Sequence, residues 1–417
     1  MKILNLSEMK RLKIFTGLFS LLAVLLFTAC NKDVEQFPDI TTGANPSPGL
    51  ATALAANSNY SLYNAVVVKS GMSATLNDST RTLTMFVPSN AAVKQAITAL
   101  TGGTVPSGAP DANFLGFINS ANFTQATAAG IVGYNVVPQK VDFAAIPAGF
   151  PNFQYPSLLN PAPQISALLR LTTFPSKTNG NFVNNAPVTS AAVNAGNGVM
   201  YETGALVAPP QRYLWDRINT DPQLTYLKAA IARADEGVAA AETLTGYLQN
   251  IGANFTVFAP TDAAFQATLT GLIYQSMVGQ GAPAGNATLQ QAQGLVTSAG
   301  VGIFHHPAVS GVLTPTNVKG IVVYHILGSR AFLNNLPTTQ ANFPTLLNGA
   351  VAAHPGVGLK VTMAGPMAAA ATVKGAANAT AANIAINPAP EPGGTSDQHY
   401  LNGVLHKIDQ VLLPQAF

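Results

Sequence analysis

Residues 83–93 read LTMFVPSNAAV, and residues 255–265 repeat the pattern as FTVFAPTDAAF. Each copy alternates like a half-buried strand and then reaches a proline, which cannot donate to a sheet ladder and therefore ends the strand. Ser89 and Thr261 follow these prolines, where an N-cap hydroxyl would accept hydrogen bonds from the first-turn amides of a helix. The sequence thus predicts two copies of the same strand-to-helix corner.

Two further pairs of segments repeat in the same order. Residues 130–137 (GIVGYNVV) match residues 320–327 (GIVVYHIL), and residues 197–200 (NGVM) match residues 402–405 (NGVL). Asn-Gly between β-prone runs is a strong hairpin signal, because both residues tolerate positive φ. The run 404–414 would then be a closing strand. Three motifs repeated in one order indicate two copies of one structural unit.

Length and composition agree with two domains and exclude a nucleic-acid partner. A chain of 417 residues is too long for one ordinary core. Apolar residues at three and four spacing predict helices at Ser61–Ser70 and Leu224–Ala234. Four of the 20 Lys and Arg residues and one of the 17 Asp and Glu residues precede Cys30, so the remainder carries 16 of each. A neutral chain without a basic stripe does not supply the phosphate neutralisation that nucleic-acid binding requires.

The first thirty residues resemble a bacterial lipoprotein leader. Basic residues at 10–13 precede an apolar run, 14–27, that is too short to span a bilayer comfortably. The run ends in LFTAC, which resembles the lipobox, in which a cysteine is acylated after cleavage. We therefore expect a signal peptide at 1–29 and a lipidated, flexible tether at 30–48. The alternative is a plain secreted protein in which Cys30, the only cysteine, is a stray thiol.

The repeated motifs together resemble a fasciclin domain. The residues that carry the resemblance are Phe258, Pro260, Thr261, Asp262, Tyr324, His325, Asn402 and Gly403. The likeness covers residues 211–417 closely and residues 49–210 more loosely. It implies an α+β fold of two tandem fasciclin-like domains, each a twisted β-sandwich or wedge with packed helices. We call residues 49–210 the first domain and residues 211–417 the second domain.

Three features depart from the family pattern. Asn135 stands in the first domain where the family commonly has histidine, which makes this domain the more divergent copy. In the second domain, residues 276–312 are rich in Gly, Ala, Gln and Ser, and residues 349–396 are rich in Ala, Gly and Pro. We expect both segments to be insertions or long loops, where variable binding surfaces tend to lie.

The search for chemistry identifies no catalytic residue, no metal site and no cofactor. All six histidines lie in the second domain, but none forms an HExxH or His-x-His pattern. No serine has the Gly-x-Ser-x-Gly context of a nucleophile. The only local acid cluster, Asp235 with Glu236 and Glu242, is expected on a solvated helix. The resemblance implies a possible interaction role for Tyr324 and His325, although the apolar run 321–327 favours a packed structural histidine.

These observations predict a lipoprotein of the cell envelope that binds and does not catalyse. The resemblance implies adhesion, or interaction with a protein or glycan partner, and the leader implies an outer-membrane anchor, on the cell surface rather than the periplasmic face. One alternative is a glycan-capture lipoprotein of a polysaccharide uptake system, although aromatic residues are scarce and Trp215 is the only tryptophan. Another is an envelope enzyme. Asp78-Ser79-Thr80 resembles an O-glycosylation acceptor but equally fits an ordinary turn.

Overall fold

The computed structural model describes residues 47–415, of which Pro48 onward belongs to one compact unit. The expected signal peptide at 1–29, the lipidation site Cys30 and nearly all of the tether at 30–48 lie outside the described residues. Within 47–415, no helix combines the length and the apolar character needed to cross a bilayer.

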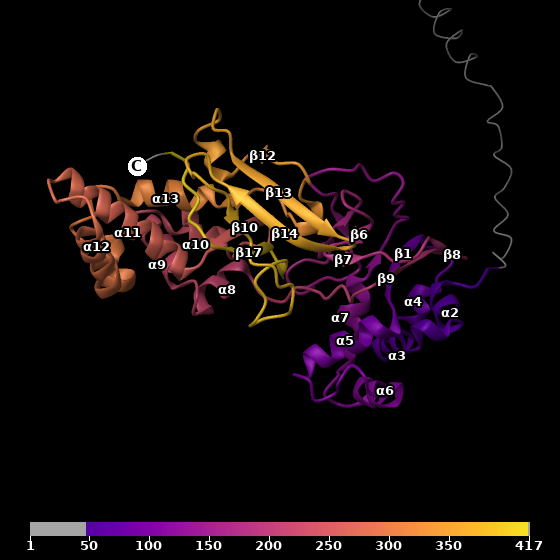
Figure 1. Cartoon of the computed structure of the whole chain (residues 1–417). Coiled ribbons are helices and arrows are strands. Elements are labelled where there is room, and N and C mark those ends of the chain that lie inside the picture. Colours follow the sequence, from indigo (N-terminus) through magenta and orange to yellow (C-terminus); the bar gives the residue numbers. More distant parts are fainter. Residues whose placement is uncertain (1–46, 416–417) are drawn as a thin grey trace, which may run out of the picture. The chain divides into compact units, whose positions relative to one another are not determined.

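Two four-stranded sheets have the same topology, with strand orders β2-β1-β9-β8 and β11-β10-β17-β16 (Figure 1). The first comprises β1 (Leu83–Pro88), β2 (Val136–Val137), β8 (Val193–Ala195) and β9 (Gly198–Thr203); the second comprises β10 (Phe255–Pro260), β11 (Ile326–Leu327), β16 (Gln398–Tyr400) and β17 (Gly403–Ile408). In each sheet the central pair is parallel and the outer pairs are antiparallel. The α+β fold with two tandem domains is therefore confirmed.

The predicted strand-to-helix corner occurs in both domains. Helix α5 (Asn90–Leu100) follows β1, and helix α11 (Asp262–Gly279) follows β10. The hydroxyl of Ser89 accepts a hydrogen bond from the amide of Ala92 at 3.3 Å, and that of Thr261 accepts one from Ala264 at 3.3 Å. The N-caps that the sequence predicted are present.

Further helices complete each domain, some packing on the sheet and others on neighbouring helices. They are α2 (Leu50–Ala55), α3 (Ser61–Ser70), α4 (Ser73–Leu76), α6 (Asp111–Asn119) and α7 (Gln125–Tyr134) in the first domain, and α8 (Leu214–Thr220), α9 (Thr225–Ala234), α10 (Leu244–Tyr247), α12 (Asn286–Ala299) and α13 (Pro315–Tyr324) in the second. Helix α3 has the predicted bounds, and α9 begins one residue after the predicted start. Short strands β3 to β7 also lie in the first domain, at Tyr155–Pro156, Thr172–Thr173, Pro175–Ser176, Phe182–Val183 and Ala186–Pro187.

The expectation that residues 276–312 form a long loop is wrong. Helix α12 occupies the middle of this segment and packs against α11 and a 3-10 turn at Gly300–His305. Thr288, Ala292 and Val296 are its buried residues, four positions apart, so one helix face meets the core. The Ala- and Gln-rich composition that suggested a loop is also a good helix composition. The glycine-containing turn before α12 and residues 306–312 remain irregular.

The expectation of a loop over residues 349–396 is wrong for residues 357–374, whereas residues 385–396 do form a loop. Strands β13 (Val357–Ala364) and β14 (Met367–Lys374) form a long hairpin, flanked by β12 (Ala341–Phe343) and β15 (Ala382–Asn383) in a third sheet (Figure 1). Leu359 and Val361 on β13 are buried with Ala371 and Val373 on β14. Alanine is depleted in strands, so its abundance concealed the alternating pattern.

The Asn-Gly hairpins are present, but the reason for them differs from the expected one. Strands β8 and β9 pair across Asn197, and β16 and β17 pair across Asn402, yet neither asparagine has a positive φ. The glycine is needed for space: a Cβ on Gly198 would lie 2.0 Å from the carbonyl oxygen of Leu83. The closing strand is shorter than predicted, because β17 ends at Ile408 and the chain to Pro414 is irregular.

Candidate functional site

Tyr324 and His325, the possible interaction residues, are buried in the second domain. The hydroxyl of Tyr324 donates to the carbonyl of Gly356 at 2.7 Å and accepts from the amide of Ala376 at 2.9 Å. The Nδ1 atom of His325 lies 2.8 Å from the carbonyl of Ile321, and its Nε2 accepts from the amide of Leu412 at 2.8 Å. Both side chains are therefore fully used inside the fold and present no surface to a partner.

Burial also fixes the charge state of His325. Desolvation lowers the pKa of its imidazole to about 4. The ring is neutral near pH 7, which agrees with one nitrogen donating to a carbonyl and the other accepting from an amide. Because both ring nitrogens of this neutral imidazole already form hydrogen bonds within the fold, neither is left to bind a ligand or to transfer a proton.

The fold-motif residues act within the second domain. Phe258 is buried and stacks on the ring of His406, with centroids 5.9 Å apart. The carboxylate of Asp262 accepts hydrogen bonds from the amide of Tyr226 at 2.9 Å and from the hydroxyl of Thr225 at 2.6 Å, at the start of α9. Asn402 accepts from the amide of Leu214 at 3.0 Å and donates to a carbonyl at 2.9 Å. These residues hold the corner, the helix start and the hairpin in place.

The histidines do not gather into a ligand set. Among residues 47–415, no group of three or more His, Cys, Asp or Glu side chains is placed to hold a metal ion. His305 pairs with Glu236 at 2.5 Å on the surface, whereas His406 lies in the core with its Nε2 at 2.8 Å from the carbonyl of Ala331. In the acid cluster, Asp235 caps helix α10 through bonds to the amides of residues 244 and 245.

Polar side chains join the two domains, and the sequence analysis did not identify them. The side-chain amide of Asn179 donates to the backbone carbonyls of Asn334 and Leu336 at 2.9 and 2.8 Å. The hydroxyl of Ser176 accepts a hydrogen bond from the side-chain amide of Asn335 at 2.6 Å. These partners are more than 150 positions apart in sequence, so no local pattern could have revealed the pairing.

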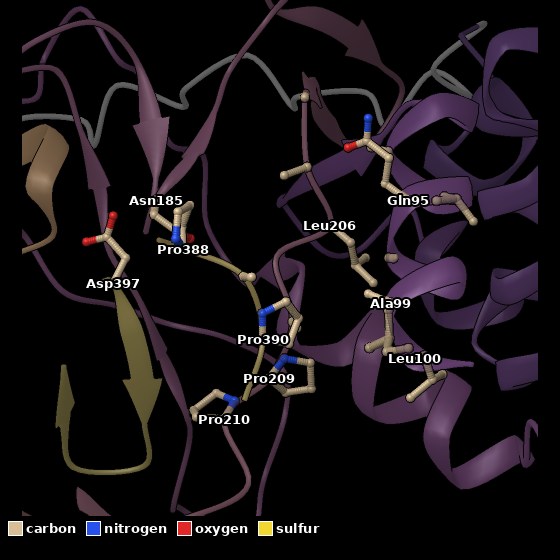
Figure 2. Close-up of a pocket in the computed structure, with 18 of the residues that line it drawn as sticks. Gln95, Ala99, Leu100, Asn185, Leu206, Pro209, Pro210, Pro388, Pro390 and Asp397 are labelled. Atoms are coloured by element: carbon tan, nitrogen blue, oxygen red, sulfur yellow. The ribbon is translucent and has the colours of Figure 1, made fainter. Parts of the chain in front are cut away.

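A large apolar cleft of about 1110 Å³ lies beside this junction. Its lining includes helix α5, the linker at 204–211 and the loop at 386–397. Figure 2 shows Pro209, Pro210 and Pro390 clustered together, with the α5 side chains Ala99 and Leu100 on one side. Prolines present rigid apolar surface at low entropic cost. The cleft thus has preformed walls suited to an apolar ligand segment.

A buried ion-pair network holds the loop wall. Arg217 on α8 is only 4% exposed and donates to the carbonyls of Pro392 and Gly394 at 3.1 and 3.0 Å. Its guanidinium lies 2.8 Å from the carboxylate of Asp221, which also meets Lys407 at 2.6 Å. Because two loop carbonyls accept hydrogen bonds from this buried guanidinium, moving the loop would remove both of those bonds and leave only the carboxylate partner. The wall is therefore held rigidly.

Carboxyl groups add a polar end to the cleft. Asp397 lines it in Figure 2, and its carboxylate accepts from the amide of Leu333 at 2.8 Å. Burial raises the pKa of Asp397 to about 7. Glu391 also lines the cleft, where it is held by Arg212 and the hydroxyl of Tyr400. The two acids are tied to the protein, so the cleft presents mainly apolar surface.

Leu100 is the most exposed large apolar residue of the cleft, at 63%. Met367, at 54%, also lines it. An exposed apolar patch that continues into a concave surface is typical of an interaction site. The prolines of the linker and of the loop were visible in the sequence, but only the folded chain shows that they face one space.

Comparison with known proteins identifies one family. The sequence profile of the fasciclin domain matches residues 58–206. This match falls on the copy whose motifs resemble the family more loosely. No curated protein sequence matches the chain at a significant level. Among solved structures, the chain is similar to a FAS1 domain pair from the insect cell adhesion molecule fasciclin I, with 15% identity and a TM-score of 0.30 over 85% of this chain and 96% of that chain.

Proposed function

We propose that the chain is a fasciclin-family protein, a non-catalytic binding protein that acts in adhesion, on the ground that the fasciclin-domain profile matches residues 58–206. The observation that carries this proposal is the preformed apolar cleft of about 1110 Å³ between the linker, α5 and the loop at 386–397. Fold resemblance alone is a weak argument for function, so the proposal rests on this surface.

The proposed ligand is an extended apolar segment of a partner protein. The cleft is lined by prolines and aliphatic side chains, which favour apolar contacts over an extended chain. The aromatic residues among its lining, Tyr63, Phe123 and Phe182, are buried and offer no flat face to a sugar. Trp215 does not line the cleft. These features make the glycan-capture alternative less favoured, because sugar binding would need an exposed stacking surface.

Membrane attachment through Cys30 completes the proposal. An acylated cysteine followed by a short tether would hold both domains close to a membrane surface, and several acyl chains give stable anchoring where one is marginal. We place the protein on the outer face of the outer membrane. Protease treatment of intact cells that express the full chain or its Cys30→Ala variant tests this, since loss of both domains from intact cells supports surface display and protection of both contradicts it.

An adhesion assay with matched variants tests the cleft. Leu100→Asp introduces a charge at a cleft position that is 63% exposed, and Val68→Asp introduces the same charge on α3 at a position that is 64% exposed and outside the cleft lining. Cells expressing each variant are allowed to attach to a layer of cells that lack the protein. We expect Leu100→Asp to lower attachment about tenfold, equivalent to about 1.4 kcal/mol, and Val68→Asp to leave it unchanged. Equal effects of the two variants would contradict the role of the cleft.

A further inference from the structure

Arg330 is a buried cation at the junction of the two domains. It follows β11 in the chain, and only 6% of it is exposed. Its Nε donates to the side-chain oxygen of Asn254 at 2.8 Å, one Nη to Nε2 of His399 at 2.6 Å and the other Nη to the carbonyl of Leu401 at 2.7 Å. The guanidinium carbon lies 4.9 Å from the centre of the Phe174 ring, which belongs to the first domain.

None of these partners carries a negative charge. Desolvation lowers the pKa of Arg330 to about 10, so its guanidinium is still charged near pH 7. Within residues 47–415, Arg330 forms no ion pair. Buried charges in proteins are normally paired, because removing an ion from water is costly. Arg217, the other deeply buried arginine, does have a carboxylate partner, Asp221.

A hollow of about 150 Å³ adjoins this guanidinium. Its lining includes a second arginine, Arg170, together with the polar side chains of Gln154, Thr172 and Asn254, and it contains no Asp or Glu. A guanidinium has five N–H groups. Three are used in the bonds above, and the remaining two find no acceptor in the described part of the chain. The hollow therefore combines positive charge, free donors and room for a small group.

We propose that this hollow binds an oxyanion, a phosphate or carboxylate group, between Arg330 and Arg170. A volume of about 150 Å³ corresponds to roughly five water molecules, enough for such a group and part of its hydration. The planar fork of Arg330 suits two parallel bonds to one oxyanion. Asn254, His399 and Leu401 hold the fork in position, while Arg170, whose Nη1 bonds to the carbonyls of residues 167 and 169, supplies charge at the rim.

The anion would also join the domains. The lining residues Phe174 and Pro210 belong to the first domain, and Arg330 and Asn254 belong to the second. An anion held between them binds only while the two domains are together. By mass action, it raises the temperature at which the junction separates.

Titration of the full chain with inorganic phosphate, acetate or chloride at constant ionic strength tests the site. Binding is measured by calorimetry and by the thermal transition of Trp215 fluorescence. We expect phosphate or acetate to bind and to raise the transition temperature, and chloride not to. A response to phosphate alone assigns a phosphoryl group, a response to acetate alone assigns a carboxylate, and a response to both assigns the general oxyanion site. No response beyond chloride overturns the proposal.

Matched variants locate the bound anion. Arg170→Gln removes the rim charge at an exposed position, and Lys360→Gln removes one exposed charge on β13, outside the hollow. We expect Arg170→Gln to weaken binding about fivefold and Lys360→Gln to leave it unchanged, whereas equal effects would overturn the assignment. Arg330→Lys keeps the charge but loses the fork, and it should weaken binding at least tenfold. If that variant fails to fold, the Arg170 and Lys360 pair still decides the question.

Discussion

The first and second domains build the same sheet but differ in one polar tie. In both domains, the hydroxyl of a threonine on β1 or β10 donates to a backbone carbonyl just after β2 or β11. Thr84 donates to the carbonyl of residue 139 at 2.7 Å, and Thr256 donates to that of residue 329 at 2.6 Å. The next tie differs, because Asn135 stands where the second domain has His325. Both donate to the carbonyl four residues earlier, at 2.8 Å. The scaffold therefore tolerates exchange of this side chain provided that its local bond is kept.

The difference lies at the far end of the side chain. Asn135 donates to the carbonyl of Val207 at 2.8 Å, whereas His325 accepts from the amide of Leu412 at 2.8 Å. Val207 and Leu412 occupy equivalent positions, ten residues after Asn197 and Asn402. The asparagine thus meets an acceptor and the histidine meets a donor. Each side chain matches the polarity of the closing segment that it holds, and the histidine makes its domain sensitive to pH.

Acidification should produce the largest difference in stability between the two domains. Burial lowers the pKa of His325 and His406 to about 4 and that of His399 well below its usual value, with Arg330 adding to the effect on His399. The unfolded state, with a pKa near 6.5 for each, binds protons that the folded state does not, so stability falls as pH drops from about 6.5 towards 4. Asp397, with a pKa of about 7 in the fold, opposes this by binding one proton more in the folded state.

Three histidines outweigh one carboxyl, so the second domain should lose on the order of 3 kcal/mol between pH 6.5 and 4.5. The first domain contains no histidine and should lose far less. Hydrogen exchange measured by mass spectrometry resolves peptides of both domains, and Trp215 fluorescence reports the second. Replacement of the exposed His305 by glutamine is the control and should leave the difference in acid sensitivity unchanged. Equal acid sensitivity of the two domains would sink this explanation.

Substitution of the hairpin glycines should give the next largest difference between the two domains. Gly198→Ala places a Cβ 2.0 Å from the backbone oxygen of Leu83, whereas at Gly403 a Cβ would lie 2.6 Å from the backbone oxygen of Phe255 and 2.5 Å from Cδ1 of Leu214, so the backbone clash is less severe there. We expect losses of about 4 kcal/mol for Gly198→Ala and about 2 kcal/mol for Gly403→Ala, measured by urea unfolding. Gly116→Ala, in the open face of α6, should instead stabilise slightly. The reverse order of the two hairpin variants would contradict the steric argument.

Exchange of the buried Asn135 and His325 side chains should give the smallest difference between the two domains. In His325→Asn, the new side-chain amide can still donate to the carbonyl of Ile321. The backbone N–H of Leu412, however, loses its acceptor. The expected loss is about 2 kcal/mol in the second domain, the usual cost of an unsatisfied buried donor. Asn135→His should cost a similar amount in the first domain, because a neutral ring cannot donate to two carbonyls at once. Thermal unfolding of both variants checks this, and no loss in either would show that the polarity match is unimportant.

Local patterns predicted much of the fold. The strand before Pro88, the cap at Ser89 and helix α3 all depend on residues close together in sequence, so their physical causes can be read directly. Helix α12 was missed because its Gly-, Ala- and Gln-rich segment was interpreted as a loop, and the β13–β14 hairpin was missed because alanine is depleted in strands. The sequence singled out Asn135 as a departure, but its bond to Val207 depends on tertiary structure.

The candidate sites were largely beyond reach of sequence analysis. Tyr324 and His325 stood out through the family resemblance, yet the structure places both in the core. Arg330 lies in an unremarkable run of the sequence, and its importance comes from the absence of a carboxylate around it among the described residues. The cleft likewise depends on segments near 100, 209 and 390 meeting in space. Such sites arise from long-range packing, which single-sequence patterns do not encode.

The hold of Arg217 on the loop at 386–397 has a kinetic consequence. Because Arg217 holds this wall through two hydrogen bonds, the cleft is preformed, so a ligand would enter without waiting for a conformational change. Association would then be limited by diffusion and orientation, and partners of different affinity would differ mainly in how long they stay bound. For two surfaces that must hold together, residence time would set the strength of attachment.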